Sequence, residues 1–163
     1  MSASVIGVDV GATGAIALLT ALGEIEWIAD MPCLADGPTG RRAINPPLLA
    51  EIAARSHATP AFVEYVGARP GEGAVGAFAF GRSRGVIEGV LGVLSIPVTM
   101  LTPPQWKRIV GIPPGRDGAK DAARSEAIRR WPAHAGLFAR VRDDGRAEAA
   151  LIALAGLVRE RRP

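Results

Sequence analysis

The sequence predicts an α/β layered domain in which helices cover a mixed sheet. Three observations predict this class. Short β-rich runs alternate with longer segments that have apolar residues at helical spacing. The first three of these runs lie close enough in the sequence to form a meander. Each of the two later runs follows a helical segment. The 163 residues are enough to bury a core, and because the chain has no long linker or internal repeat we expect one domain over residues 1–163.

The first part of the chain predicts three strands and a loop. Val5–Asp9 is a β-rich run that ends in an acid, and a glycine turn at residues 11–14 leads to the apolar run Ala15–Leu19. Residues 24–28 alternate between polar and apolar, which is typical of a strand with one solvent-exposed face. Residues 36–42 are rich in Gly, Pro and Arg and are predicted as a loop.

The central part predicts a helix, a strand, a loop and a second helix. Asn45 caps a helix at residues 46–55, and Ala61–Glu64 is a short buried strand that again ends in an acid. Residues 67–76 hold four glycines and one proline and are predicted as a loop. The apolar helix at 77–94 contains four glycines, each costing about 1 kcal/mol relative to alanine in an isolated helix, so we expect it to pack closely against a sheet or a second helix. These glycines are Gly81, Gly85, Gly89 and Gly92.

The C-terminal part predicts the fifth strand and three helices. Residues 96–101 form the strand, Pro103–Val110 a short helix, and residues 111–118 a loop. A charged helix at 120–131 follows, and the last helix, at 144–159, has an apolar face and acids at its start that suit the helix dipole.

The composition excludes several classes of protein. Cys33 is the only cysteine, so no intramolecular disulfide can form, and together with His57 and His134 it cannot make a typical zinc site. The longest apolar stretch, residues 86–101, is too short to span a bilayer, and the N-terminus lacks the basic region of a signal peptide. We therefore expect a soluble intracellular protein with no membrane partner.

Charge is unevenly distributed along the chain. Residues 1–104 hold six Lys/Arg and nine Asp/Glu, a net charge of −3, whereas residues 105–163 hold thirteen and seven, a net charge of +6. A basic C-terminal part indicates a polyanionic partner, although a solvated helical surface explains the same pattern equally well.

Carboxylates recur where the predicted elements end or begin. Asp9 and Glu64 end two strands, and if these strands are neighbours the two acids lie side by side at one edge of the sheet. Asp144 and Glu148 are four residues apart and so project from one face of the last helix. Facing carboxylates repel unless a cation lies among them, and Mg²⁺ prefers oxygen ligands. Two such ions can activate a water and stabilise the leaving oxygen in phosphodiester cleavage.

Each acid also has a purely structural explanation. Asp9 can cap the glycine turn that follows it, and Glu64 can be an exposed strand end. Asp143 and Asp144 can be N-caps, and Glu148 an acid of the first helical turn. The occurrence of the whole set across three elements favours the metal site.

An ordered set of segments resembles the RuvC-type Holliday junction resolvases. In chain order these segments are IGVDVG at 6–11, FVE at 62–64, GRSRG at 81–85, QWKRIVG at 105–111, Lys120, and DGRAEA at 144–149. The resemblance spans about the whole chain and implies an RNase H-like fold, in which a five-stranded mixed sheet combines a three-strand antiparallel meander with two parallel strands and is flanked by helices. It also implies a homodimer that cuts four-way DNA junctions symmetrically with Mg²⁺ or Mn²⁺, with two ions per site. The chain is similar to compact bacterial or phage-encoded members, which implies a cytoplasmic location in a bacterial cell or an infected host.

The resemblance implies a set of metal ligands. The matching residues are Asp9, Glu64, Asp144 and Glu148. The family commonly spaces its last two acids three residues apart, but the residue three before Glu148 is Gly145. Asp144 is preferred because a spacing of four keeps both acids on one helix face, whereas Asp143 is expected to be a helix cap or a solvent-facing acid. The choice between Asp144 and Asp143 stays open at this point.

Basic and aromatic residues complete the predicted site. By the same resemblance, Lys107 and Lys120 contact the phosphates near the cut, and Lys120 also stabilises charge on the cleaved phosphate. Arg69 and Arg116 are further predicted DNA contacts. Tyr65 either stacks on a base at the junction or packs on the sheet, with neither alternative preferred.

Three other aromatic residues have less specific predictions. Trp106 can shield the site, but a half-buried side chain with a packing role is preferred. Phe78 and Phe80 are expected in the core or in the helix that forms the dimer.

The predicted function is thus a Mg²⁺-dependent endonuclease for Holliday or other branched DNA junctions, dimeric through the glycine-rich helix. One alternative is a sugar-kinase-like or Hsp70-like phosphotransferase, because residues 9–14 look like the phosphate-binding turn of that superfamily. Those proteins place the nucleotide between two such domains, whereas this length corresponds to one. A second alternative is a nucleic-acid-binding module without activity.

Overall fold

A computed structural model describes residues 4–57, 59–114 and 119–161 of the chain. Its centre is a five-stranded sheet with the strand order β3-β2-β1-β6-β7. The strands are β1 (Val5–Asp9), β2 (Ala15–Leu19), β3 (Ile25–Asp30), β6 (Ala61–Glu64) and β7 (Val98–Leu101). Strands β1 to β3 pair antiparallel, and β6 pairs parallel with both β1 and β7. This arrangement confirms the predicted meander with two parallel strands.

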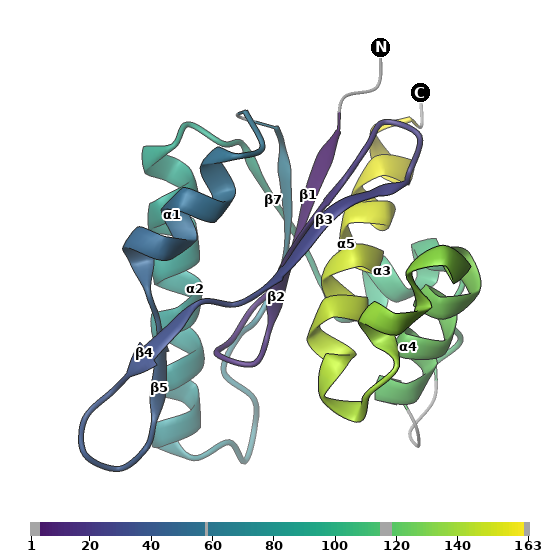
Figure 1. The fold of residues 1–163 in the computed structure, drawn as a ribbon. Helices are drawn as coiled ribbons and strands as arrows, with labels where there is room; N and C mark the ends of the chain where they lie inside the picture. Colours follow the sequence, from purple (N-terminus) through teal and green to yellow (C-terminus); the bar gives the residue numbers. More distant parts are fainter. Residues whose placement is uncertain (1–3, 58, 115–118, 162–163) are drawn as a thin grey trace.

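Helices cover both faces of the sheet (Figure 1). On one face lie α1 (Pro46–Ala54) and α2 (Ala74–Val93), and on the other lie α3 (Pro103–Val110), α4 (Ala119–Arg130) and α5 (Asp144–Glu160). Because alternate side chains of each strand point to opposite faces, the strands fill two apolar clusters, one with Ile6 and Val8 and the other with Val5 and Ala17. None of the helices described has the length and hydropathy needed to cross a membrane.

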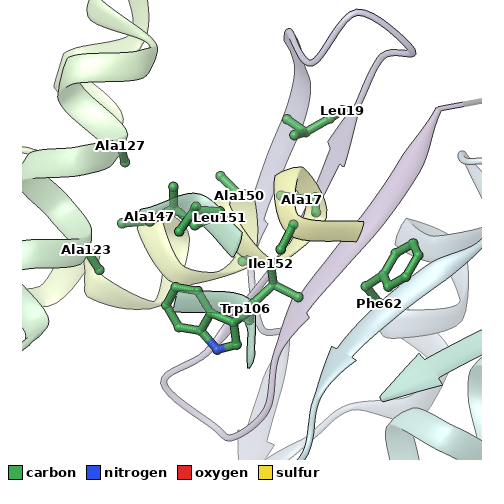
Figure 2. Packing of buried hydrophobic residues seen from close by; sticks show 14 of the residues in the cluster. Ala17, Leu19, Phe62, Trp106, Ala123, Ala127, Ala147, Ala150, Leu151 and Ile152 are labelled. Atoms are coloured by element: carbon green, nitrogen blue, oxygen red, sulfur yellow. The ribbon is translucent and has the colours of Figure 1, made fainter. Parts of the chain in front are cut away.

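Helix α5 packs closely against β1. A Cβ atom at Gly7 would lie 2.1 Å from the carbonyl oxygen of Ala149, so only glycine permits this approach. Gly156 fits in the same way against the ring of Phe62, where an added Cβ would lie 2.0 Å from a ring carbon. Figure 2 shows the small side chains Ala147 and Ala150 in the cluster on this face. The close contact brings the first turns of α5 to the edge of the sheet where β1 ends.

The start of β1 and the end of α5 lie at the same end of the molecule (Figure 1). Helix α5 begins near Asp9, since an added Cβ at Gly145 would be 3.2 Å from the Asp9 carboxylate. It passes Gly7 at Ala149 and ends near the β2–β3 turn, where Arg161 donates a hydrogen bond to the carbonyl of Ala21. Helix α5 therefore runs antiparallel to β1.

A two-stranded hairpin flanks the predicted loop at residues 36–42, of which only Arg42 lies in a strand. Strands β4 (Cys33–Ala35) and β5 (Arg42–Ile44) pair antiparallel, and the predicted loop forms mainly the connection between them. The Cys33 thiol donates a hydrogen bond of 3.3 Å to the carbonyl of Ala12, which links the hairpin to the β1–β2 turn. Three-residue strands carry too little alternation to be predicted from their own sequence.

The glycines of α2 do not pack against the sheet. An added Cβ at Gly81, Gly85, Gly89 or Gly92 would meet nothing within 4 Å among the described residues, and all four are exposed. Helix α2 instead contacts the rest of the chain through Ser83, Ile87 and Leu91. Packing of these glycines against the sheet is therefore a wrong prediction, whereas packing against a second helix of another copy stays a prediction. The exposed stripe faces away from the sheet.

Candidate active site

Three carboxylates meet at one edge of the sheet. Asp9 ends β1, Glu64 ends β6, and Glu148 lies in the second turn of α5. Because β1 and β6 are parallel neighbours, their C-terminal ends lie together, as the sequence predicts. One oxygen from each of the three carboxylates lies within 4.8 Å of the others. Hard anionic oxygens at this spacing are a donor set that fits a divalent cation such as Mg²⁺.

The start of α5 leaves no room for a side chain at position 145. Gly145 is buried, and an added Cβ would lie 2.6 Å from the carbonyl oxygen of Thr13 and 3.2 Å from the Asp9 carboxylate. The family that the sequence resembles commonly has an acid three residues before its last one, which corresponds to position 145 in this chain. A fourth carboxylate in this chain must therefore come from another position.

The two candidates for that fourth carboxylate have different surroundings. Asp144 is half-buried at the first position of α5, one turn before Glu148, and its Oδ1 accepts a hydrogen bond of 3.1 Å from the Gly145 amide. Asp143 occupies the N-cap position of α5 without a side-chain cap hydrogen bond.

Asp143 is not a solvent-facing acid, because only 2% of it is exposed. Its carboxylate accepts hydrogen bonds of 2.9 Å from both the backbone amide and the guanidinium of Arg140. Arg146, at 3.8 Å, adds a second cation. These arginines, Arg140 first, lower the pKa of Asp143 below its ordinary value. The carboxylate is thus held by arginines, and Asp144 remains the prediction for the fourth ligand.

Glu64 is held by Trp106, for which the sequence favours a packing role over one at the site. The indole Nε1 of Trp106 donates a hydrogen bond of 3.0 Å to Glu64 Oε1. Trp106 is 0% exposed, so the expectation of a half-buried side chain is wrong. Burial raises the pKa of Glu64, whereas the Trp106 hydrogen bond and the charges of Lys107 and Arg69 lower it in part. Trp106 therefore belongs to the carboxylate site.

The predicted DNA contacts are only partly placed by the structure. The ammonium of Lys107 lies 5.3 Å from the centre of the Trp106 ring. Trp106 is the residue that donates a hydrogen bond to Glu64. Lys120 is the second residue of α4, and Arg116 lies outside the described residues.

Tyr65 directly follows Glu64 and is 46% exposed. The guanidinium of Arg84 in α2 lies 4.6 Å from the centre of its ring. One face of the ring is thus covered by a cation.

Phe78 and Phe80 lie on the surface, so their assignment to the core is wrong. Phe78 is 72% exposed and Phe80 is 37% exposed. Both line a cavity of about 600 Å³ between α2, the β4–β5 hairpin and the turn that follows Asp9. Their role in a dimer stays a prediction.

The sheet order and the placement of the helices match the RuvC/RNase H-like fold. Two solved structures of RuvC from Thermus thermophilus are similar to this chain. One, in complex with a Holliday junction substrate, matches with a TM-score of 0.69 and 18% identity over 98% of this chain and 95% of that one. The other, a RuvC structure of the same species, matches with a TM-score of 0.58 and 18% identity over 97% and 95%. No protein-family model matches the sequence, and no curated protein matches it.

Proposed function

We propose that this protein is a Mg²⁺-dependent endodeoxyribonuclease of the Holliday junction resolvase kind. The observation that carries the proposal is the cluster of Asp9, Glu64 and Glu148, three oxygen donors within 4.8 Å of one another where β1 and β6 of an RNase H-like sheet end. The similar RuvC structure that holds a Holliday junction supports a branched DNA substrate.

The carboxylates would hold the cations, with Mn²⁺ as a substitute for Mg²⁺. Asp9, Glu64 and Glu148 are the ligands we assign, and Asp144 is the fourth. When bound, the ions supply an activated water and stabilise the leaving oxygen of the phosphodiester. The protein's own contribution is to hold these acids together, which α5 achieves by packing on β1 at Gly7.

Cations of this chain would bind the DNA backbone. We assign this role to Lys107, Lys120, Arg69 and Arg116, with Lys120 also stabilising charge on the cleaved phosphate. The exposed ring of Tyr65 would stack on a base of the junction.

A symmetric junction needs two equivalent cuts, and we therefore propose a C2 homodimer. Helix α2 supports this assembly because its glycine stripe is exposed and permits close approach of a second helix. Phe78 and Val93, exposed by 72% and 87%, add apolar area to the same helix. In a C2 pair the same surface of both copies would meet.

The decisive experiment compares Asp9→Asn with the unmodified protein on a synthetic four-way junction. We expect no cleavage with Mg²⁺ but unchanged junction binding measured with Ca²⁺, because the substitution removes a cation ligand and no phosphate contact. Glu51→Gln, which neutralises an exposed acid on α1, is the control and should cut normally. Full cleavage by Asp9→Asn, or by the unmodified protein in EDTA, contradicts the proposal. Junction binding without cleavage by the unmodified protein indicates a binding module, and ATP hydrolysis by the unmodified protein without DNA indicates a phosphotransferase.

A further inference from the structure

The indole of Trp106 is a buried donor aimed at the carboxylate site. The side chain belongs to the apolar cluster beneath α5, where Figure 2 shows it close to Ile152. Its nitrogen lies on the edge of the ring turned away from Ala147 and Leu151 (Figure 2). At that edge the N–H reaches Glu64 Oε1 at 3.0 Å. An indole nitrogen only donates, so it needs an acceptor when buried and cannot itself bind a cation.

The backbone holds Trp106 in this position. Helix α3 starts directly after β7, and a capping box between Thr102 and Gln105 fixes its first turn. Trp106 follows Gln105, so its direction is set by a rigid helix start rather than by a loop. Glu64 ends the neighbouring strand, β6. The hydrogen bond therefore joins two elements whose relative position is fixed by the parallel pairing of β6 and β7.

We propose that Trp106 is a positioning residue of the carboxylate site, whose buried N–H orients Glu64 for the cation that Asp9 and Glu148 share; this inference rests on the proposed function. A glutamate has three rotatable side-chain bonds, and ordering them on cation binding costs free energy. A hydrogen bond that already holds one carboxylate oxygen removes part of that cost. Partners of this kind behind a metal ligand typically contribute 10–100-fold to metal affinity or activity.

Trp131 offers a matched control within the same chain. It is also buried, at 4% exposure, in the same apolar cluster, and its Nε1 donates a hydrogen bond of 2.9 Å to the carbonyl of Gly23. Trp131→Phe thus removes the same amount of side chain and the same kind of donor as Trp106→Phe, but at the β2–β3 turn instead of the carboxylates.

The test is a titration with Mn²⁺, in which electron paramagnetic resonance measures the free hexaaqua ion. We expect Trp106→Phe to weaken Mn²⁺ binding by roughly 10–100-fold. Trp131→Phe should bind Mn²⁺ like the unmodified protein. In cleavage assays, Trp106→Phe should need more Mn²⁺ and recover its rate when Mn²⁺ is saturating. In the Glu64→Gln background, the substitution at position 106 should cause no further loss, because the carboxylate it acts through is gone.

A second substitution keeps the test decisive where Trp106→Phe does not fold. Replacing Trp106 by benzothienylalanine exchanges the N–H for sulfur and keeps the bicyclic shape, so the same loss of Mn²⁺ affinity is expected. Unchanged Mn²⁺ binding by either Trp106 variant overturns the inference, as does an equal loss in Trp131→Phe. If the unmodified protein binds Mn²⁺ with the expected Trp106 dependence but cuts no DNA, the proposed function fails and the positioning role stands.

Discussion

Gly145 accounts for the unusual spacing of acids in this chain. The carbonyl of Thr13 and the Asp9 carboxylate occupy the space that a side chain at position 145 would need. An acid three residues before Glu148 is thus sterically excluded, and the position one residue earlier is the nearest that keeps a carboxylate on the same helix face.

The roles of the two neighbouring aspartates can be separated by substitution. We expect Asp144→Asn to lower the single-turnover cleavage rate by orders of magnitude, because a cation ligand is lost. Asp143→Asn should cut at close to the normal rate, because its carboxylate already binds Arg140. Both rates are measured on a four-way junction at saturating Mg²⁺. An inactive Asp143→Asn beside an active Asp144→Asn would reverse the assignment.

Asp143 should instead affect stability in a pH-dependent way. Arg140 lowers the pKa of Asp143 in the folded protein, so the ion pair stabilises the fold at pH values above the ordinary aspartate pKa of 3.8. This contribution is lost as the pH falls through the lowered pKa. We expect Asp143→Asn to reduce the free energy of unfolding by about 2 kcal/mol at neutral pH. Urea unfolding at several pH values should show the difference from the unmodified protein shrinking in acid. A difference that persists unchanged in acid would rule out the ion pair as its cause.

At the scale of elements, the contact of α5 with β1 holds the site together. Gly7→Ala would place a methyl group 2.1 Å from the Ala149 carbonyl oxygen and push the helix away from the strand. We expect a loss of about 3 kcal/mol in the free energy of unfolding. Gly136→Ala is the control, because a methyl group there meets nothing within 4 Å. Equal stability of the two variants in urea would show that α5 can move without cost.

Helix α2 carries the predicted interface between two copies. Gly85→Glu should give a folded monomer, because two carboxylates would face each other where the helices approach. Light scattering at micromolar concentration measures the oligomeric state, and circular dichroism measures whether the variant is folded. Gly136→Glu, at an exposed glycine away from α2, should remain a dimer. A dimeric Gly85→Glu variant would place the interface elsewhere.

The elements differ in how far the sequence could predict them. The strands Val5–Asp9 and Ala61–Glu64 could be predicted because their apolar runs and terminal acids are local signals. The β4–β5 hairpin could not, since three-residue strands depend on a partner strand. The bond between Trp106 and Glu64 joins residues 42 positions apart, and no local pattern encodes such a contact. The direction of the α2 glycines likewise depends on which helix face the sheet covers.

At the scale of the whole molecule, the described residues of the basic C-terminal part lie on one side of the sheet with α3, α4 and α5 (Figure 1). Residues 105–163 carry a net charge of +6 against −3 for the rest. We expect junction affinity to fall steeply with salt, by on the order of 10³-fold between about 50 and 200 mM if six phosphates are contacted. Fluorescence anisotropy of a labelled junction in Ca²⁺ measures this dependence. An affinity that does not change with salt would exclude backbone binding by these cations.

The antiparallel course of α5 along β1 has a practical consequence for experiments on single molecules. Since the strand starts where the helix ends, Val5 and Arg161 lie at one end of the β1–α5 pair, while Asp9 and Glu148 lie toward its other end. A surface anchor at either end would leave the carboxylates open to a long DNA. Val5 pairs with Leu19, and Arg161 donates a hydrogen bond to Ala21 two residues further on, so these two positions lie near each other. A linker between them should be tolerated, and a circular permutant opened at the exposed tip of the β4–β5 hairpin should keep the sheet order.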